Sequence, residues 1–186
     1  APGPIDLFRV NDETATDQNG PSVAVNANGE MIVAWVSDHN GLVDPLDPEK
    51  SVFARWFAAD GSPLGDTEFL VHDYVKDAQE HPAVAIDDTG RFVITWQSIN
   101  QELNQDGAGT SWGVYARQFE VDHAAGTILP VQPAEFRVNQ QVDGPQRFPA
   151  VSSDAAGQFL VAWQSLNQDG SSWAVVQRVY AADGTP

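Results

Sequence analysis

The sequence predicts an all-β fold built from β-propeller blades, and three observations support this prediction. Val, Ile, Phe, Tyr and Trp are concentrated in runs of about four to seven residues, which Gly, Asp, Asn and Pro separate, as is typical of short strands. The periodicity of an amphipathic helix is missing. The chain also repeats itself three times, and tandem four-stranded units that bury both faces against their neighbours are characteristic of propellers. A β-sandwich or a β-prism is the alternative.

Each repeat opens on a predicted outer strand with the pattern Phe-x-Val. The pattern reads FRVN at residues 8–11, FLVH at residues 69–72 and FRVN at residues 136–139. These positions predict a single domain, residues 1–186, of three repeats that span approximately residues 8–68, 69–135 and 136–186.

A proline-led strand and a Trp-ended strand follow in each repeat, and a tight turn joins them. The aligned residues are Pro21, Pro82 and Pro149 at the start, Gly29, Gly90 and Gly157 in the turn, and Trp35, Trp96 and Trp163 near the end. The glycine supplies the positive φ that such a hairpin needs. We expect the tryptophans to act as core wedges, because the runs that they end are apolar almost throughout.

The third strand of each repeat carries an arginine at the same position. These arginines are Arg55, Arg117 and Arg178. We expect each one to lie across neighbouring strands or to pair with a nearby acid such as Glu68 or Glu135, since a residue that recurs in every blade usually serves the blade. A ring of arginines that binds an anionic ligand is the alternative.

The chain stops before a fourth outer strand, so we expect residues 8–11 to supply the outer strand of the last blade in a strand-swapped closure. Propellers usually have about four to eight blades. Three blades would therefore pair with a second copy, continue in a longer array, or dock their exposed edges on other protein subunits.

The composition narrows the classes of partner and chemistry. With 26 acidic groups against 9 basic ones and a net charge of −17, nucleic acids and anionic membranes are disfavoured partners, whereas cations and basic proteins are favoured. No apolar run is long enough to span a membrane. The absence of cysteine excludes disulfides, cysteine-ligated zinc and a thiol nucleophile. The four histidines lack a zinc spacing, and no G-x-S-x-G motif is present.

The loops between the Trp-ended and Arg-bearing strands are rich in the oxygen ligands that calcium prefers. The candidate metal ligands are Asn104, Asp106, Asn167, Asp169, Asp38, Asn40 and Asp44. Asn-x-Asp-Gly is also what a tight turn uses, and the EF-hand pattern is absent, so a calcium site and a plain turn both stay open. Beside these loops, Trp112 and Trp173 are the candidate contacts for a glycan or a partner protein.

The repeat as a whole, with EF-x-VN, P-AV-x-x-D-x-x-G-x-F-V-x-W-Q-S, N-Q-D-G-x-x-W and A-R-x-F-x-A-D-G, resembles a tandem repeat of large secreted bacterial proteins. Many of those proteins also carry haemolysin-type calcium-binding modules. The resemblance covers nearly the whole chain, although the first repeat lacks the N-Q-D-G loop. It implies an extracellular, propeller-like module. SSDAAGQFLVAW, at residues 152–163, is also similar to the sialidase Asp-box, which stabilises a turn away from the catalytic centre.

We therefore expect a non-catalytic binding or structural module, not an enzyme, that is secreted, periplasmic or on the cell surface. It would associate with other subunits or with a second copy of itself through blade edges and loops, with calcium as its one candidate cofactor. The first alternative is a carbohydrate-binding propeller that uses Trp112 and Trp173. The second is a sialidase-like glycoside hydrolase, although the arginine cluster expected of it is missing. The start APGP fits a mature form after signal-peptide removal, or a fragment.

Overall fold

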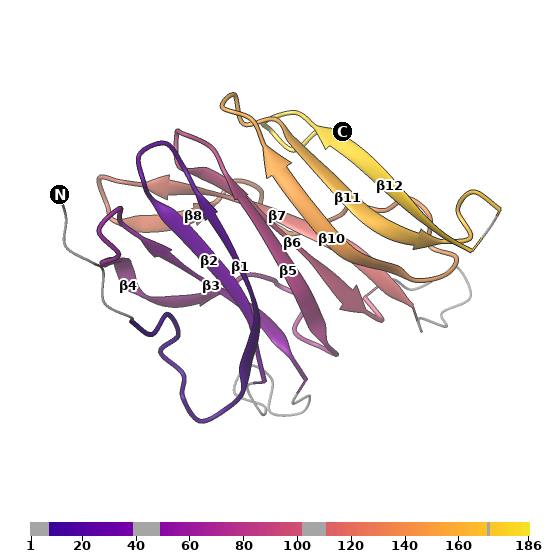
Figure 1. The fold of residues 1–186 in the computed structure, drawn as a ribbon, viewed down its shortest axis with the longest axis horizontal. Coiled ribbons are helices and arrows are strands. Elements are labelled where there is room, and N and C mark those ends of the chain that lie inside the picture. The colour runs from indigo at the N-terminus through magenta and orange to yellow at the C-terminus, as the bar shows by residue number, and fades with distance from the viewer. Residues whose placement is uncertain (1–7, 39–48, 102–110, 171) are drawn as a thin grey trace.

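A computed structural model describes residues 8–38, 49–101, 111–170 and 172–186 of the protein. These residues form strands, turns and bends but no helix, which confirms the all-β prediction. The strands make three antiparallel sheets that lie side by side in chain order and do not close on one another (Figure 1). None of the described residues belongs to a helix with the length and hydropathy that crossing a membrane would require.

The three sheets repeat one strand order. Sheet 1 consists of β1 (Gln18–Val25), β2 (Met31–Ser37), β3 (Ser51–Phe57) and β4 (Pro63–Leu70). Sheet 2 consists of β5 (Gln79–Ile86), β6 (Arg91–Ile99), β7 (Trp112–Asp122) and β8 (Thr127–Pro130), and β9 (Phe136–Arg137) also pairs with β7. Sheet 3 consists of β10 (Gln146–Ser153), β11 (Phe159–Leu166) and β12 (Trp173–Tyr180). The expected order of proline-led, Trp-ended, Arg-bearing and outer strand is thus present, although sheet 3 has no outer strand among the described residues.

The expectation of a strand-swapped closure is wrong. Residues 8–11 form no strand, and they lie against sheet 1 rather than beside β12. The ring of Phe8 packs on that of Phe57 at 5.5 Å, and the carbonyl of Val10 accepts a hydrogen bond of 3.0 Å from Arg55. The outer strands of sheets 1 and 2 instead follow their own sheets in the sequence, as β4 and as β8 with β9. The edge of β12 therefore has no partner strand among the described residues.

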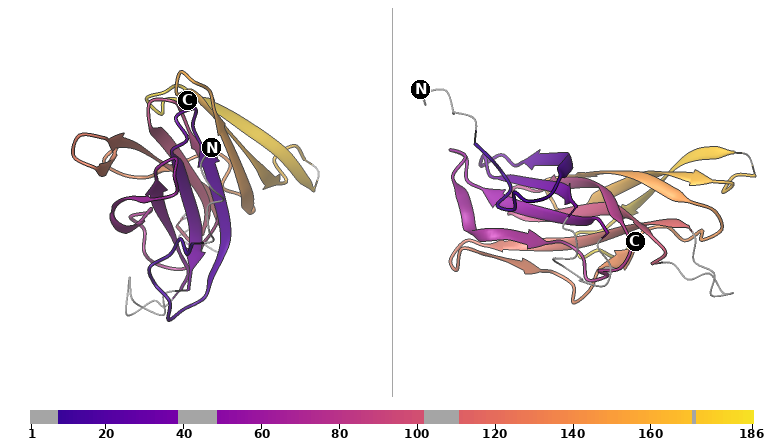
Figure 2. Two further views of the ribbon diagram at one scale, coloured as in Figure 1. Left: turned by 60° about the vertical axis from the view of Figure 1, so that its left-hand side comes forward. Right: turned by 90° about the horizontal axis from the view of Figure 1, so that it is seen from below.

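The apolar core lies in two layers between the sheets. One layer joins sheets 1 and 2 and includes Ile32, Trp56 and Trp96, and the other joins sheets 2 and 3 and includes Val161 and Tyr180. Sheet 2 is covered on both faces, so β6 is buried over nearly its whole length. On β12, at one side of the molecule in both views of Figure 2, exposed and half-buried residues alternate instead.

A tryptophan and a glutamine share a hydrogen bond inside every sheet. The indole Nε1 of Trp35, Trp96 and Trp163 donates to the Oε1 of Gln18, Gln79 and Gln146 at 2.8, 3.1 and 2.9 Å respectively. The expected role of these tryptophans as core residues agrees with their exposed fractions of 4, 0 and 5%. The glutamines were not predicted, although each stands three residues before the aligned proline.

The repeated arginines also serve the sheets. The Nη1 atoms of Arg55, Arg117 and Arg178 donate to the backbone carbonyls of Val10, Val71 and Val138. Each guanidinium also lies over an aromatic ring of its own strand, at 5.5 to 5.8 Å from the ring centre. The expected acid partners, Glu68 and Glu135, are wrong. The paired acids are Asp12 and Asp73, because the two glutamates accept hydrogen bonds from the backbone nitrogens of these same aspartates.

Candidate functional site

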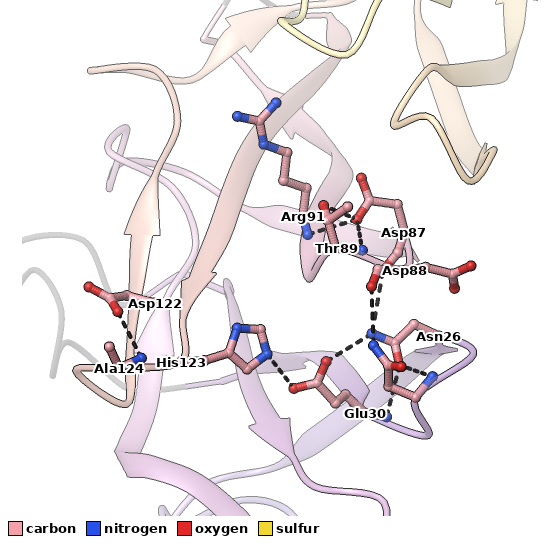
Figure 3. Close-up of polar contacts among 10 residues, drawn as sticks. Asn26, Glu30, Asp87, Asp88, Thr89, Arg91, Asp122, His123 and Ala124 are labelled. Carbon is pink, nitrogen blue, oxygen red and sulfur yellow. Dashed lines mark hydrogen bonds and ion pairs between the residues drawn. The ribbon is translucent and has the colours of Figure 1, made fainter.

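Each sheet has two ends of different character. At the loop end, the innermost strands β1, β5 and β10 begin, the second strands β2, β6 and β11 end, and the third strands β3, β7 and β12 begin. At the turn end, tight hairpin turns join the first two strands. Figure 3 shows the turn end, where side chains from different sheets meet.

The polar groups at the turn end hold the turns in place. The Oδ1 atoms of Asn26, Asp87 and Asp154 each accept two backbone N–H groups from their own turn, at 2.8 to 3.0 Å. Asp154 belongs to the stretch that is similar to an Asp-box, so this stretch acts as a turn-stabilising device. His123 and Glu30 join two sheets through a contact of 2.8 Å (Figure 3). These groups at the turn end are engaged in holding the structure, so the candidate site lies at the loop end.

The same backbone distortion opens each sheet at the loop end. A β-bulge interrupts the pairing of the first two strands just before the aligned prolines. Its residues Gly20, His81 and Phe148 have φ of 60, 53 and 54°, a conformation that is uncommon for residues other than glycine. Bulges and such backbone outliers are over-represented near functional sites, where they redirect side chains. At this end, the bulges of sheets 2 and 3 present Glu80, His81, Arg147 and Phe148.

A lysine at the loop end pairs with an acid of the next sheet. The Nζ of Lys50, just before β3, lies 2.8 Å from the Oε1 of Glu80 on β5, so this ion pair joins sheets 1 and 2. The hydrogen bond and charge of Glu80 raise the pKa of Lys50, and the charge of Asp38 adds to the effect. One Oδ1 of Asp38 is buried without a hydrogen-bond partner among the described residues. Lys50 is therefore in direct contact with one carboxylate, that of Glu80 on the neighbouring sheet, and its pKa also reflects the charges of Asp38 and Glu49.

Aromatic and cationic side chains extend this group of residues across sheets 2 and 3. The rings of His81 and Phe148 meet edge to face at 4.7 Å, and the guanidinium of Arg147 lies 5.2 Å from the centre of the Trp112 ring. The backbone N–H of Phe148 also donates to the Oε1 of Gln97 on β6 at 3.1 Å. The ring of Phe148 keeps 43% of its surface exposed. We call Asp38, Lys50, Glu80, His81, Trp112, Arg147 and Phe148 the loop-end cluster.

The predicted metal ligands are only partly within the described residues. Asn104, Asp106, Asn40 and Asp44 lie outside them. Asn167 and Asp169 are exposed in a tight turn, in which the N–H of Gly170 donates to the carbonyl of Asn167 at 3.4 Å. Nowhere in the described parts of the chain do three acids or histidines group as metal ligands would. Calcium binding at these loops stays a prediction, and Asp38 is the one predicted ligand that joins the loop-end cluster.

The two predicted ligand-binding tryptophans occupy equivalent positions in sheets 2 and 3. Trp112 begins β7 and is half-buried by Arg147, whereas Trp173 begins β12 and keeps 45% of its surface exposed. Only Trp112 therefore belongs to the loop-end cluster. Sequence reasoning missed Lys50, Glu80 and Arg147 because they do not recur as one residue type. Their positions do recur, since Glu80 and Arg147 both stand two residues before an aligned proline.

A separate cavity of about 350 Å³ lies between the outer strands of sheets 1 and 2. Its lining is largely apolar and includes Trp56, Phe69, Phe119 and Ile128. Arg117 is the only charged side chain described in this lining, and it is already bound to Asp73. The cavity thus lacks the acid–base groups that the loop-end cluster offers.

The fold is similar to that of several solved glycoside hydrolases. The endo-arabinase of Bacteroides thetaiotaomicron VPI-5482 matches with a TM-score of 0.55 and 14% identity, over 97% of this chain and 62% of the endo-arabinase. A thermostable family-43 glycoside hydrolase matches with a TM-score of 0.52 and 11% identity, over 94% of this chain and 61% of its own. A family 117 glycoside hydrolase of the marine bacterium Zobellia galactanivorans matches with a TM-score of 0.52 and 12% identity, over 96% of this chain and 57% of its own.

No family model matches the chain, and no curated protein matches its sequence. The similarity of the solved structures therefore concerns the fold, and the chain spans about three fifths of the length of each. These similarities contradict the expectation of a non-catalytic structural subunit that is not an enzyme, because proteins that share the fold are glycoside hydrolases. The sequence pointed away from catalysis because it has no G-x-S-x-G motif, no zinc spacing of its histidines and no sialidase-like arginine cluster.

Proposed function

We propose that the three sheets are blades of a β-propeller and that they form part of a carbohydrate-active enzyme whose sugar site is the loop-end cluster. The observation that carries the proposal is this cluster, which gathers two acids, a lysine, an arginine and aromatic rings from three sheets. The fold similarity to glycoside hydrolases supports it. Because the chain spans only part of those enzymes, the remaining blades would come from outside the described residues.

Glycoside hydrolysis generally needs two carboxyl groups on either side of the scissile bond. In this proposal Glu80 and Asp38 are those groups. One protonates the leaving oxygen as the glycosidic C–O bond breaks, and the other assists the attack of water on the sugar carbon, so that water is consumed and a reducing end is released. Lys50 is a positioning residue, because its ammonium group fixes the Glu80 carboxylate at 2.8 Å.

The aromatic rings of the loop-end cluster suit the binding of sugar. The apolar faces of a pyranose or furanose ring stack on aromatic side chains, and hydroxyl groups bind to charged and amide groups. Trp112 is held by Arg147, and Phe148 is held by His81 and by the backbone hydrogen bond to Gln97. These contacts pre-organise two rings at the loop end, which favours a carbohydrate over a small charged ligand.

The test is the release of reducing ends from a panel of plant and algal polysaccharides, with linear arabinan as the first substrate. We expect Glu80→Gln to lower the rate by about 100-fold or more, because removal of an acid–base group costs a rate factor of this order. The matched control is Glu120→Gln, since Glu120 is an exposed acid that pairs with Arg91 at 3.5 Å at the turn end. Equal losses in the two variants, or turnover that survives Glu80→Gln, would contradict the proposal.

Binding of a polysaccharide without any turnover would favour the carbohydrate-binding alternative instead. Three further proposals are independent of this activity. They are that the protein is exported, that it belongs to a secreted tandem-repeat protein, and that it binds calcium. Calorimetric titration of metal-stripped protein with calcium tests the last of these. Heat that saturates in the parent protein and is lost in Asp169→Ala combined with Asp106→Ala would support a site, whereas a flat titration would leave plain turns.

A further inference from the structure

Sheets 1 and 3 each leave one face uncovered, and both faces are apolar. On sheet 3, Val175 is 79% exposed, whereas the equivalent Val114 of sheet 2 is fully buried against sheet 3. On sheet 1, Val23 is 61% exposed, whereas the equivalent Val84 of sheet 2 is only 7% exposed and packs against sheet 1. These valines are exposed because no further sheet among the described residues packs on them, and not because they are polar.

The two uncovered faces are the two halves of the interface that the protein already uses internally. In sheets 1 and 2, a valine near the start of the third strand, Val52 or Val114, marks the face that packs on the next sheet. This face contacts the innermost strand of that next sheet. Sheet 3 offers the first kind of face through Val175. Sheet 1 offers the second kind through Val23 and Val25. A further contact of the same kind is thus available between sheet 3 and sheet 1.

The polar contacts at the loop end follow the same rule. Lys50 contacts Glu80, and Trp112 contacts Arg147. In both pairs the first residue stands two positions before the valine of the third strand, and the second stands two positions before the aligned proline of the next sheet. The next pair in this series is Trp173 with Asn19.

A second series of contacts agrees with the first. Gln97 accepts a hydrogen bond from the bulge residue Phe148 of sheet 3. Its equivalent in sheet 3 is Gln164, which is exposed, and the matching bulge residue of sheet 1 is Gly20, with φ of 60°. Trp173 and Gln164 on sheet 3 therefore each have a counterpart on sheet 1, Asn19 and Gly20.

We propose that sheet 3 of one molecule packs on sheet 1 of a second copy of this chain, with Trp173 against Asn19 and Gln164 against the backbone N–H of Gly20. A second copy fits because it carries the missing half of each interface. The chain has a net charge of −17, and yet six exposed residues available for this contact are uncharged, namely Val23, Val25, Gln164, Trp173, Val175 and Val179.

The contact is head-to-tail, because sheet 1 and sheet 3 are different surfaces. If sheet 3 of each copy packs on sheet 1 of the other, two copies close a ring that contains the three sheets of each copy. Such a ring falls within the usual range of about four to eight blades. This inference does not depend on the proposed enzymatic activity.

The test is the mass of the purified chain in solution, measured by light scattering over a range of concentrations. We expect a species of twice 20.1 kDa that dissociates in the variant Val175→Asp and equally in Val23→Asp, because each one places a charge in the apolar contact. The matched control is Leu129→Asp, since Leu129 is 44% exposed on β8 and lies on neither face. A monomer at every concentration, or a dimer that survives both face variants, would overturn the proposal.

A cross-linking experiment tests the head-to-tail geometry separately. The chain has no cysteine, so Trp173→Cys and Asn19→Cys introduce single thiols. We expect a short thiol-reactive cross-linker to join an equimolar mixture of the two variants and to leave each variant alone unlinked. Efficient linking of Trp173→Cys to itself would indicate a symmetric contact between two copies of sheet 3 and would refute the head-to-tail arrangement.

Discussion

The buried hydrogen bond between Trp96 and Gln79 provides a sharp test of how the sheets are held together. Both side chains are fully buried, and the indole Nε1 donates to Oε1 at 3.1 Å. The glutamine Nε2 also donates to the carbonyl of Lys76 at 3.0 Å, but Lys76 is exposed, so water can replace that bond. In Gln79→Leu the indole N–H is left buried without an acceptor, which costs about 1–3 kcal/mol of the free energy of unfolding.

The assay is urea unfolding, followed by tryptophan fluorescence and by circular dichroism, whose transitions must coincide for a free energy to be defined. A double-mutant cycle with Trp96→Phe isolates the pair, because phenylalanine has no N–H to satisfy. We expect Gln79→Leu to lower the free energy of unfolding of the parent protein by about 1 kcal/mol or more beyond the loss that it causes in the Trp96→Phe variant. Strictly additive losses would refute the reasoning that this hydrogen bond stabilises the sheet.

Two further predictions concern turns. Gly29→Ala should lower the free energy of unfolding by more than Gly170→Ala in the same urea assay. Both glycines have φ near +80°, a conformation that costs an alanine about 1–2 kcal/mol. Only at Gly29 would the new Cβ also clash, because it would lie 2.6 Å from the Cβ of Ala59. Equal losses of stability in the two variants would contradict this steric argument. Ser62→Ala should raise the pKa of Asp60 toward its usual value, because hydrogen bonds from the Ser62 hydroxyl and N–H lower it. Since the folded pKa is depressed, this contribution to stability is present above the unfolded pKa and is lost as the pH falls; carboxyl-carbon NMR titration measures the shift, and an unchanged pKa would contradict the assignment.

Much of the fold could be predicted because the repeat constrains it. The aligned prolines, glycines and tryptophans predicted the strands and their order, since turn glycines and apolar strands have local causes in the sequence. The destination of residues 8–11 could not be predicted, because an FRVN strand fits any sheet with a free edge. Only the contacts of Phe8 and Val10 within sheet 1 decide it.

The candidate site was harder to predict than the fold. Trp112 was predicted because it stands beside a variable loop, but Lys50 occupies the equivalent position in sheet 1 and has a different chemistry. The pairing of Lys50 with Glu80 depends on contact between two sheets, and one sequence does not reveal such a contact. The bulges that present Glu80 and Arg147 were also hidden, since positive φ at His81 and Phe148 has no signature in residue type.

Binding of sugar by the loop-end cluster is tested most directly by the indole N–H signals of the six tryptophans. In ¹⁵N NMR spectra, assigned with Trp112→Phe and Trp96→Phe, we expect an arabino-oligosaccharide to shift the indole signal of Trp112, beside Arg147, and to leave that of the fully buried Trp96 in place. The shift of Trp112 should saturate with oligosaccharide concentration and should disappear in Arg147→Ala. Saturable binding of the sugar that leaves the Trp112 signal unmoved would contradict the claim.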